Sequence, residues 1–298
     1  MPQISTHNPT PLVKWVGGKR QLQTPILRKI VEVFDPQNGT YFEPFFGGGA
    51  IYFALQPQKA FASDINAGLV NLYNRVTHDL ENVESELLAL QARYNVLGAD
   101  EQQKFYLEKR KVFNEISSDG SFAMRLGATG AALFLFLNKA GFNGMYRENA
   151  NGEFNIPFGK RSTVNLFEAE NLEVASAALR RLDVACQDYS DTVTTAEPGD
   201  LVYFDPPYAP LSKTSSFEGY NKSNLGGFDQ TALRDLFIEL TERGVHCLVS
   251  NSSAPVIEEL YSGFTFSPLT ASRAVSASSA GRKSVKEYLI DNFKQVQR

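Results

Sequence analysis

The spacing of apolar residues predicts that strands and helices alternate over the first part of the chain. Apolar residues recur at every fourth position across residues 19–34, which predicts a helix. Short β-prone runs predict strands at residues 40–42 and 60–62, with a helix beginning near Ala50 between them. Alternation of this kind is typical of parallel α/β architecture, so α/β is the fold class that we expect.

The middle of the chain has a different pattern. Residues 69–136 read as several helices with charged faces, among them helices over 101–116 and 122–137. A loop rich in Asn and Gly follows at residues 138–159. This region therefore resembles a mostly helical insertion into an α/β fold.

The α/β pattern resumes after the insertion. Residues 201–204 and 245–249 are apolar, β-prone runs that predict buried strands, and residues 229–242 predict a helix between them. The pattern predicts three parts: 1–67, the first part of an α/β domain; 68–167, a helical insertion; and 168–298, the rest of the α/β domain.

Composition excludes several classes of protein. The 298 residues allow one large domain or a domain that carries an insertion. No apolar run is long enough to span a bilayer, and the polar residues 1–11 lack a signal-peptide core. Two distant cysteines predict neither a disulfide scaffold nor a Cys-based metal site. We expect a cytoplasmic protein without a membrane partner or a metal ion.

Charge adds little to the picture. The net charge of −4 argues weakly against nucleic acid as a partner, but phosphate contacts need only a local basic surface. Small basic clusters occur at residues 138–163 and 271–286. Taken by charge alone, both clusters are best interpreted as solvated faces.

The most specific motif is Asp205-Pro206-Pro207-Tyr208, which directly follows a predicted strand. Ligands bind at the carboxyl ends of strands in parallel α/β sheets. The two prolines stop the strand and hold a rigid turn, which offers a carboxylate, the Pro206 carbonyl and an aromatic face. An amino group on an aromatic ring needs two acceptors and a stacking partner. The alternative is a proline-rich strand exit with a core tyrosine.

A second motif is the glycine-rich segment of residues 42–50, which lies between a predicted strand and a predicted helix. Three glycines there allow the backbone to approach a ligand closely, although the spacing is not that of a dinucleotide fingerprint. Asp64 follows the next predicted strand, where an acid can accept hydrogen bonds from ribose hydroxyls. The alternatives are a tight turn for the glycines and a helix cap for Asp64.

A third motif, residues 14–20, superficially resembles a phosphate-binding loop. The required glycine spacing and the Ser or Thr after the lysine are absent, which excludes a P-loop nucleoside triphosphatase. Trp15 is the only tryptophan of the chain, and core packing is an alternative role for it.

Together these motifs resemble the Dam-type DNA adenine methyltransferases, the D12 class, over nearly the whole chain. Segments 14–19, 43–49, 64–66 and 205–212 are similar to the cofactor and catalytic motifs of that family, in its α-type order. Residues 138–147 and 152–159 are similar to its DNA-reading segment, and residues 281–283 also match. The resemblance implies a Rossmann-like methyltransferase fold with an inserted target-recognition domain, and S-adenosylmethionine as cofactor.

The resemblance also implies roles for single residues. Lys14 would contact the outer guanine of a GATC site, Phe142 and Asn143 would enter the duplex beside the target adenine, and Arg147 would read a base edge. Position 142 is often Tyr in the family, and here Phe keeps the stacking surface without the hydroxyl. The expected residues are, for catalysis, Asp205, Pro206, Pro207 and Tyr208; for cofactor binding, Trp15, Lys19, Glu43, Phe45, Gly47, Gly49, Asp64 and Asp205; and for DNA binding, Lys14, Phe142, Asn143, Arg147 and Arg282.

We therefore expect a bacterial or phage enzyme that methylates the exocyclic amino group of adenine in double-stranded DNA after flipping the base, as a monomer or weak dimer. Two alternatives stay open. One is a methyltransferase of another amino or amide group, such as cytosine in DNA, adenine in RNA or a protein glutamine. The other is a DNA-binding relative without activity, against which the intact Asp205–Tyr208 motif argues.

Overall fold

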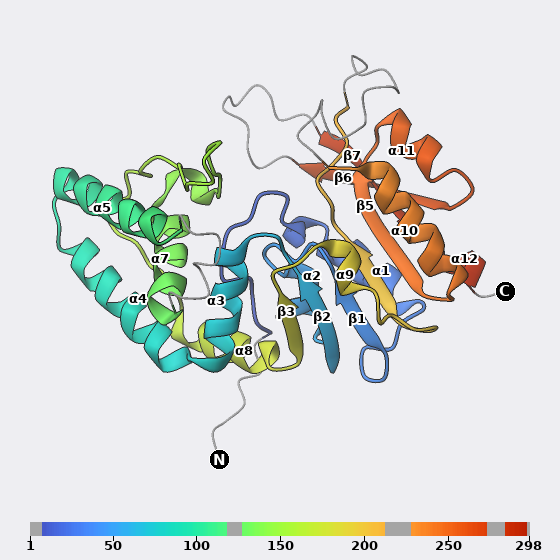
Figure 1. Ribbon diagram of the computed structural model, residues 1–298, viewed down its shortest axis with the longest axis horizontal. Coiled ribbons are helices and arrows are strands. Elements are labelled where there is room, and N and C mark those ends of the chain that lie inside the picture. The colour runs from blue at the N-terminus through green and yellow to red at the C-terminus, as the bar shows by residue number, and fades with distance from the viewer. Residues whose placement is uncertain (1–7, 118–126, 212–227, 273–283, 297–298) are drawn as a thin grey trace. The chain divides into compact units, whose positions relative to one another are not determined.

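The computed structural model describes residues 8–117, 127–211, 228–272 and 284–296, and the chain divides into two compact units (Figure 1). The first unit consists of residues 1–20, 46–56 and 63–188, and the second of residues 21–45, 57–62 and 189–298. In chain order the elements are η1 (Lys19–Gln21), α1 (Gln23–Val31), β1 (Thr40–Glu43), α2 (Ala50–Leu55), β2 (Lys59–Ser63), α3 (Ala67–His78), α4 (Leu80–Asn95), α5 (Ala99–Ser117), α7 (Gly127–Ala140), η2 (Phe142–Gly144), α8 (Ala169–Leu179), β3 (Leu182–Ala185), α9 (Tyr189–Thr192), β4 (Leu201–Phe204), α10 (Gln230–Glu242), β5 (His246–Ser252), α11 (Pro255–Leu260), β6 (Thr265–Ser272), β7 (Ser284–Asp291) and α12 (Phe293–Val296).

The first unit is mostly helical and is organised around α7. This helix is apolar on every side, and most of its residues are buried, as expected of a helix in the middle of a core. The neighbouring helices α3, α4 and α5 all pack against it (Figure 1). The helix therefore forms the centre of a small bundle, from whose carboxyl end the loop of residues 141–159 continues.

The second unit contains the central part of a mostly parallel sheet. Its strands follow the order β2-β1-β4-β5-β7-β6 (Figure 1). Strands β2, β1, β4 and β5 are parallel, whereas β7 is antiparallel to both β5 and β6. All four residues of β4 are buried, because this strand has neighbours on both edges and a covered surface on both faces. The α/β fold class expected from the sequence is confirmed.

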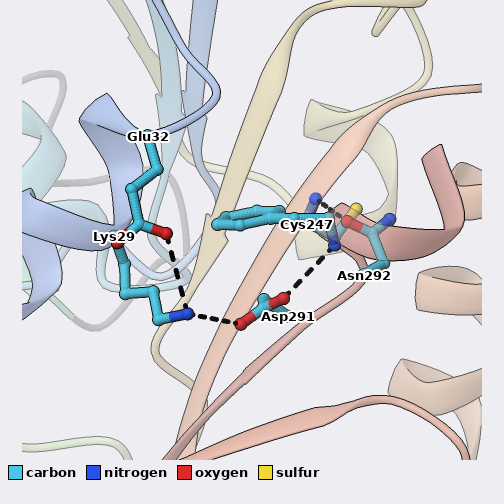
Figure 2. Close-up of polar contacts among 6 residues, drawn as sticks. Lys29, Glu32, Cys247, Asp291 and Asn292 are labelled. Atoms are coloured by element: carbon cyan, nitrogen blue, oxygen red, sulfur yellow. Dashed lines mark hydrogen bonds and ion pairs between the residues drawn. The ribbon is translucent and has the colours of Figure 1, made fainter. Parts of the chain in front are cut away.

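Polar contacts connect the last strand of the second unit to α1 and β5 (Figure 2). The Nζ atom of Lys29 in α1 lies 3.2 Å from Oδ2 of the buried Asp291, and 3.8 Å from Oε2 of Glu32. The next residue, Asn292, accepts a hydrogen bond of 2.8 Å from the Cys247 backbone N–H. Because buried polar groups need partners, these contacts favour a single placement of β7 beside β5.

Most predicted elements are confirmed, with differences at their ends. Strand β4 has the predicted bounds, and the helix predicted over 229–242 begins one residue later because Asp229 caps it. The helix predicted over 19–34 is shorter, since its first turn is the 3-10 helix η1. Strand β5 extends three polar residues beyond the predicted run, to Ser252. The predicted start of the 122–137 helix lies outside the described residues.

Two further observations concern the cysteines and the length of the helices. Both cysteines are free thiols; Cys186 is exposed and Cys247 is buried. Among the helices of the described residues, none has both the length and the apolar character needed to cross a membrane.

Candidate functional site

Glycines shape the loop of residues 46–49, which leads into α2. Gly47 and Gly49 have φ angles of +48° and +64°, values that other residues rarely adopt. A Cβ atom on Gly47 would lie 2.7 Å from Cδ1 of Trp15, and one on Gly49 would lie 2.7 Å from Cζ of Phe46. The loop therefore needs glycine both for its backbone conformation and for the close approach of aromatic rings.

The carboxylate of Asp64 is bound to this loop. Its Oδ2 atom accepts a hydrogen bond of 3.0 Å from the Gly47 N–H, and its Oδ1 atom accepts one of 2.9 Å from the Asn66 N–H. The cap of α3 is Asn66, whose side chain accepts a hydrogen bond from the Leu69 N–H. Asp64 is therefore not the cap of α3, which was the alternative role predicted for it.

Burial raises the pKa of Asp64 above its usual value of 3.8, although both backbone hydrogen bonds act in the opposite direction. A carboxylate oxygen can accept two hydrogen bonds, so each oxygen of Asp64 has capacity for a ligand hydroxyl beside its backbone partner. The next side chain, Ile65, is 84% exposed, which is unusual for an isoleucine. An acid with an apolar neighbour is suited to a ligand with a ribose and a flat base.

Three aromatic rings stack beside the loop of residues 46–49. The ring of Trp15 lies 5.6 Å from that of Tyr146, and the ring of Tyr146 lies 5.3 Å from that of Phe134, with interplanar angles below 30° in both pairs. The Tyr146 hydroxyl donates to Oε1 of Glu148 at 2.6 Å. Burial and this hydrogen bond raise the pKa of Tyr146, so its hydroxyl stays protonated.

The two lysines of the amino-terminal motif differ in exposure. Lys14 has an exposed side chain, and the buried amide of Asn138 binds both its backbone N–H at 3.0 Å and its carbonyl at 2.9 Å. The same amide donates to the Gly144 carbonyl at 3.0 Å. Lys19 is buried, and its Nζ atom donates to the Gly17 carbonyl at 2.7 Å. One buried side chain thus joins the Lys14 segment to the loop of residues 141–159.

That loop presents the side chains expected to meet DNA. Phe142 is 49% exposed although it is a large apolar residue, and Asn143 has a φ of +56°. Arg147 is exposed, and its Nε atom donates to Oδ1 of Asn155 at 2.7 Å. Backbone hydrogen bonds fold the loop onto itself, for example from the Phe142 N–H to the Pro157 carbonyl. An exposed aromatic residue on a well-bonded loop is a candidate for contact with a partner.

In the second unit, Glu43 and Phe45 occur at the end of β1 and just after it. Glu43 is buried and accepts a hydrogen bond of 2.9 Å from the Tyr41 hydroxyl. Burial and the charge of Glu43 raise the pKa of Tyr41, so that its hydroxyl remains a donor. The ring of Phe45 stacks on Tyr189 at 5.1 Å and meets the edge of Phe228 at 5.5 Å. These ring contacts give Phe45 a role in packing, and its role in binding a ligand stays a prediction.

The loop of residues 205–211 leaves the carboxyl end of β4. One oxygen of Asp205, Oδ1, accepts a hydrogen bond of 2.8 Å from the Ser250 hydroxyl. The Pro207 carbonyl accepts one of 2.7 Å from the side-chain amide of Gln230. Pro206 between them is buried, so the turn is anchored both by its rings and by polar contacts.

Tyr208 is the aromatic residue of this loop. Its hydroxyl donates to Oε2 of Glu287 on β7 at 2.9 Å. Burial raises the pKa of Tyr208 strongly, and the charges of Asp205 and Glu287 act in the same direction. The phenol is therefore neutral over the ordinary pH range, and its ring is suited to stacking and not to proton transfer.

The two units thus each bring together part of the predicted set. The first unit contains Lys14, Trp15, Lys19, Gly47, Gly49, Asp64, Phe142, Asn143 and Arg147, and the second contains Glu43, Phe45, Asp205, Pro206, Pro207 and Tyr208. Arg282 lies outside the described residues. Their roles in catalysis and binding stay predictions at this point.

Sequence reasoning missed several residues that hold these side chains. They are Asn138, Tyr146, Ser250 and Glu287, none of which was given a role. Asn138 and Tyr146 carried a signal, since both lie in the segment of residues 138–147 that resembles a DNA-reading segment. Within the described residues, no group of three or more His, Cys, Asp or Glu side chains is arranged to hold a metal ion.

Comparison with known proteins gives concordant matches. A family model described as D12 class N6 adenine-specific DNA methyltransferase matches residues 15–275. The type II methyltransferase M1.LlaDCHI of Lactococcus lactis subsp. cremoris is 36% identical over 288 residues, which cover 96% of both chains. The type II methyltransferase M.MjaIII of Methanocaldococcus jannaschii is 34% identical and covers 95% of this chain and 99% of its own. The DNA adenine methylase of Escherichia coli K12 is 31% identical, with 93% of each chain covered.

Proposed function

The chain belongs to the D12 class of N6 adenine-specific DNA methyltransferases, and from this membership we propose that it methylates N6 of an adenine flipped out of duplex DNA. S-adenosylmethionine is the proposed methyl donor and GATC the proposed site. The resemblance of residues 138–147 and 152–159 to the DNA-reading segment of the family, and the DNA contact that it implies for Lys14, support this specificity. We also propose a cytoplasmic location and a bacterial or phage origin.

The observation that carries the proposal is the loop at the end of β4. It offers the Asp205 carboxylate, oriented by Ser250, and the neutral ring of Tyr208, fixed by Glu287, within four residues. Flipping a base out of a duplex costs a few kcal/mol. Stacking on an aromatic ring contributes about 1–3 kcal/mol per base, enough to offset much of that cost. Tyr208 is the stacking partner that we propose.

Asp205 and the Pro206 carbonyl would accept the two hydrogens of the adenine amino group. Those bonds draw the nitrogen toward tetrahedral geometry and localise a lone pair that is otherwise delocalised into the ring. Positive charge would develop on the nitrogen as its bond to the methyl carbon forms and the carbon–sulfur bond of the donor breaks, with a neutral thioether as the leaving group. The Asp205 carboxylate would stabilise that charge where it appears, and one amino proton would then be lost to solvent. The amino nitrogen thereby becomes a nucleophile without the need for a separate general base before attack.

The residues of the first unit fit the cofactor. Asp64 offers acceptors for ribose hydroxyls, and the positive φ angles of Gly47 and Gly49 favour glycine, so that no side chain projects from these two positions. When bound, S-adenosylmethionine supplies an electrophilic methyl group. Trp15, Lys19, Glu43, Phe45 and Asp205 complete the proposed set of cofactor residues.

DNA recognition is assigned to the exposed side chains of the first unit. We propose that Phe142 and Asn143 enter the duplex and that Arg147 pairs with the acceptors of a guanine in the major groove. Lys14 would contact the outer guanine. The Asn138 amide supports this assignment, because it joins the Lys14 segment to the loop that contains the other three residues. Arg282, as a further DNA contact, and a monomeric or weakly dimeric state also stay predictions.

The test of the proposal is nucleoside analysis. The full chain is incubated with labelled S-adenosylmethionine and an unmethylated duplex that contains one GATC site, beside duplexes with each single substitution of that site. We expect N6-methyladenine on GATC alone. N4-methylcytosine, or transfer only to RNA or protein, would overturn the chemistry, and equal activity on all duplexes would overturn the specificity.

Arg147→Ala separates base reading from phosphate contact. Loss of a base contact costs about 1–3 kcal/mol and relaxes discrimination at one position of the site. Loss of a phosphate contact weakens all sequences alike and flattens the dependence on salt. Relaxed discrimination at one base pair is the result we expect, measured as kcat/KM on the same panel of duplexes.

A further inference from the structure

We propose that Ser250, at the carboxyl end of β5, is a positioning residue for methyl transfer. Its hydroxyl holds one oxygen of the Asp205 carboxylate and so sets the orientation of that group. The inference rests on the proposed function, in which Asp205 accepts a hydrogen from the target amino group. It assigns to Ser250 an effect mainly on the rate of transfer and not on the binding of the duplex.

The first support is the unusual composition of the end of β5. Ser250, Asn251 and Ser252 are consecutive polar residues that are 1%, 0% and 4% exposed. They follow an apolar, fully buried stretch of the same strand. Burying a polar group is costly unless it is hydrogen-bonded, so three in succession indicate a specific set of partners.

Each of the three side chains has a hydrogen-bond partner in the loop after β4. The Ser250 hydroxyl donates to Asp205, Asn251 accepts from the Ala209 N–H at 3.2 Å, and the Ser252 hydroxyl donates to the Ala209 carbonyl at 2.6 Å. Strands β4 and β5 are parallel neighbours whose register pairs Phe204 with Val249. The residues that follow this pair are Asp205 and Ser250, so the register itself brings the two together.

The hydroxyl of Tyr203 is a second hydrogen-bond partner of Ser250, and it bears on which group donates to which. The Tyr203 hydroxyl lies 3.1 Å from the Ser250 hydroxyl oxygen, and both side chains are buried. Burial and the charge of Asp205 raise the pKa of Tyr203, so this phenol keeps its proton. A serine hydroxyl has one hydrogen to donate. When the carboxylate receives it, Tyr203 is the donor to Ser250, and the hydrogen bonds run from Tyr203 through Ser250 to Asp205.

Orientation matters because rotation about the bond to a carboxylate is soft. The side-chain torsion that turns the carboxylate of an aspartate has broad minima, so the backbone alone does not fix where its oxygens point. A donor at a fixed position selects one rotation. Misplacement of a catalytic group by about 1 Å can lower a rate by about 10²-fold. Ser250 supplies such a donor from a rigid, central strand.

The experiment compares Ser250→Ala with Ser250→Thr, which keeps a hydroxyl, and with Ser252→Ala, which removes a buried hydroxyl that does not contact Asp205. Single-turnover transfer to a GATC duplex gives the rate constant, and equilibrium binding gives the affinities for duplex and S-adenosylmethionine. We expect Ser250→Ala to lose about tenfold to hundredfold in rate, the value of a hydrogen bond to a charged group. The duplex affinity should stay within about twofold of wild type, and any loss of S-adenosylmethionine affinity should be smaller than the loss of rate, because Asp205 is only one of several proposed cofactor residues.

Three further results are expected and separate positioning from folding. Ser250→Thr should recover most of the rate, and Ser252→Ala should lose much less than Ser250→Ala although it deletes the same atom from the same strand. The acid limb of the rate–pH profile of Ser250→Ala should move to higher pH, because the ionised carboxylate loses a donor. Circular dichroism melting curves identify any variant that does not fold.

Two outcomes would overturn the inference. One is a Ser250→Ala enzyme with a rate within about threefold of wild type, and the other is an equal loss in Ser252→Ala. If the wild-type chain instead makes no N6-methyladenine on any duplex, the proposed function fails first and the role of Ser250 with it. A wild-type enzyme that makes this product beside an equally fast Ser250→Ala variant overturns only the positioning role.

Discussion

The two units hold their candidate site residues in different ways. In the first unit, glycine loops approach aromatic rings, and Trp15, Tyr146 and Phe134 form a stack. In the second unit, partly buried hydrogen bonds from β5 and β7 hold the loop that follows β4. Stacked rings create a surface and tolerate small shifts, whereas a hydrogen bond fixes the direction of one group. The contrast suits the first unit to binding and the second to the reaction.

The largest expected effect comes from the second unit. Asp205→Ala should lower the rate of methyl transfer by at least about 10²–10³-fold, the usual cost of removing a group that stabilises developing charge. Duplex binding should largely persist, because the exposed side chains of residues 142–147 are unchanged. Single-turnover kinetics and an electrophoretic binding assay measure the two effects. Full activity in this variant would contradict the mechanism and the contrast between the units.

Asp64→Ala should show the opposite pattern. Removal of a charged acceptor of ribose hydroxyls should weaken S-adenosylmethionine about tenfold to hundredfold, that is, by roughly 1.5–3 kcal/mol. Isothermal titration calorimetry measures this affinity, and Asp183→Ala, which changes an exposed aspartate of the same unit, is the matched control. An unchanged affinity in the folded Asp64 variant would remove Asp64 from the cofactor site.

The same site predicts a dependence on pH. Burial raises the pKa of Asp64, so its carboxylate takes up a proton at a higher pH than the usual value of 3.8 as the pH falls. A protonated carboxyl is a poorer acceptor, and cofactor affinity should therefore decline with falling pH before an exposed aspartate would titrate. In the Asp64→Ala variant this acid limb should be absent.

Gly47→Ala tests whether the close approach of Trp15 is as important as the backbone conformation. Gly152→Ala is the control, because Gly152 also has a positive φ, +77°, but a Cβ atom there would meet nothing within 4 Å. Both variants carry a strain of about 1–2 kcal/mol. Only Gly47→Ala displaces a stacked ring, which adds about 1–3 kcal/mol. Urea denaturation should show this difference, and equal losses would mean that Trp15 moves freely.

The smallest expected effect concerns the aromatic stack. Tyr146→Leu keeps an apolar side chain but loses the ring contacts with Trp15 and Phe134, which should lower the free energy of unfolding by about 0.5–1.5 kcal/mol beyond the change in buried area. Tyr146→Phe keeps the stack and loses only the bond to Glu148. If both variants are equally destabilised, the hydroxyl and not the stack holds this loop.

The ends of β4 and β5 show which element boundaries the local hydrophobic pattern can predict and which it cannot. The apolar run of residues 201–204 predicted the bounds of β4 correctly, because all four of its residues are buried and the run ends where the strand ends. The predicted end of β5 was wrong by three residues, because Ser250, Asn251 and Ser252 are polar and yet buried. The sequence of a polar residue does not show whether it will find a buried partner, so the pattern alone ended the predicted strand at residue 249.

The sequence by itself determined the family, the α/β class and the motifs that bear chemistry, because these depend on short stretches with a fixed spacing. Only the tertiary structure decided which side chains hold those motifs. Asn138 meets Lys14 across 124 positions of sequence, and Tyr208 meets Glu287 across 79. Such contacts arise when the backbone folds and buried polar atoms must find partners. Local spacing contains no information about partners at that distance.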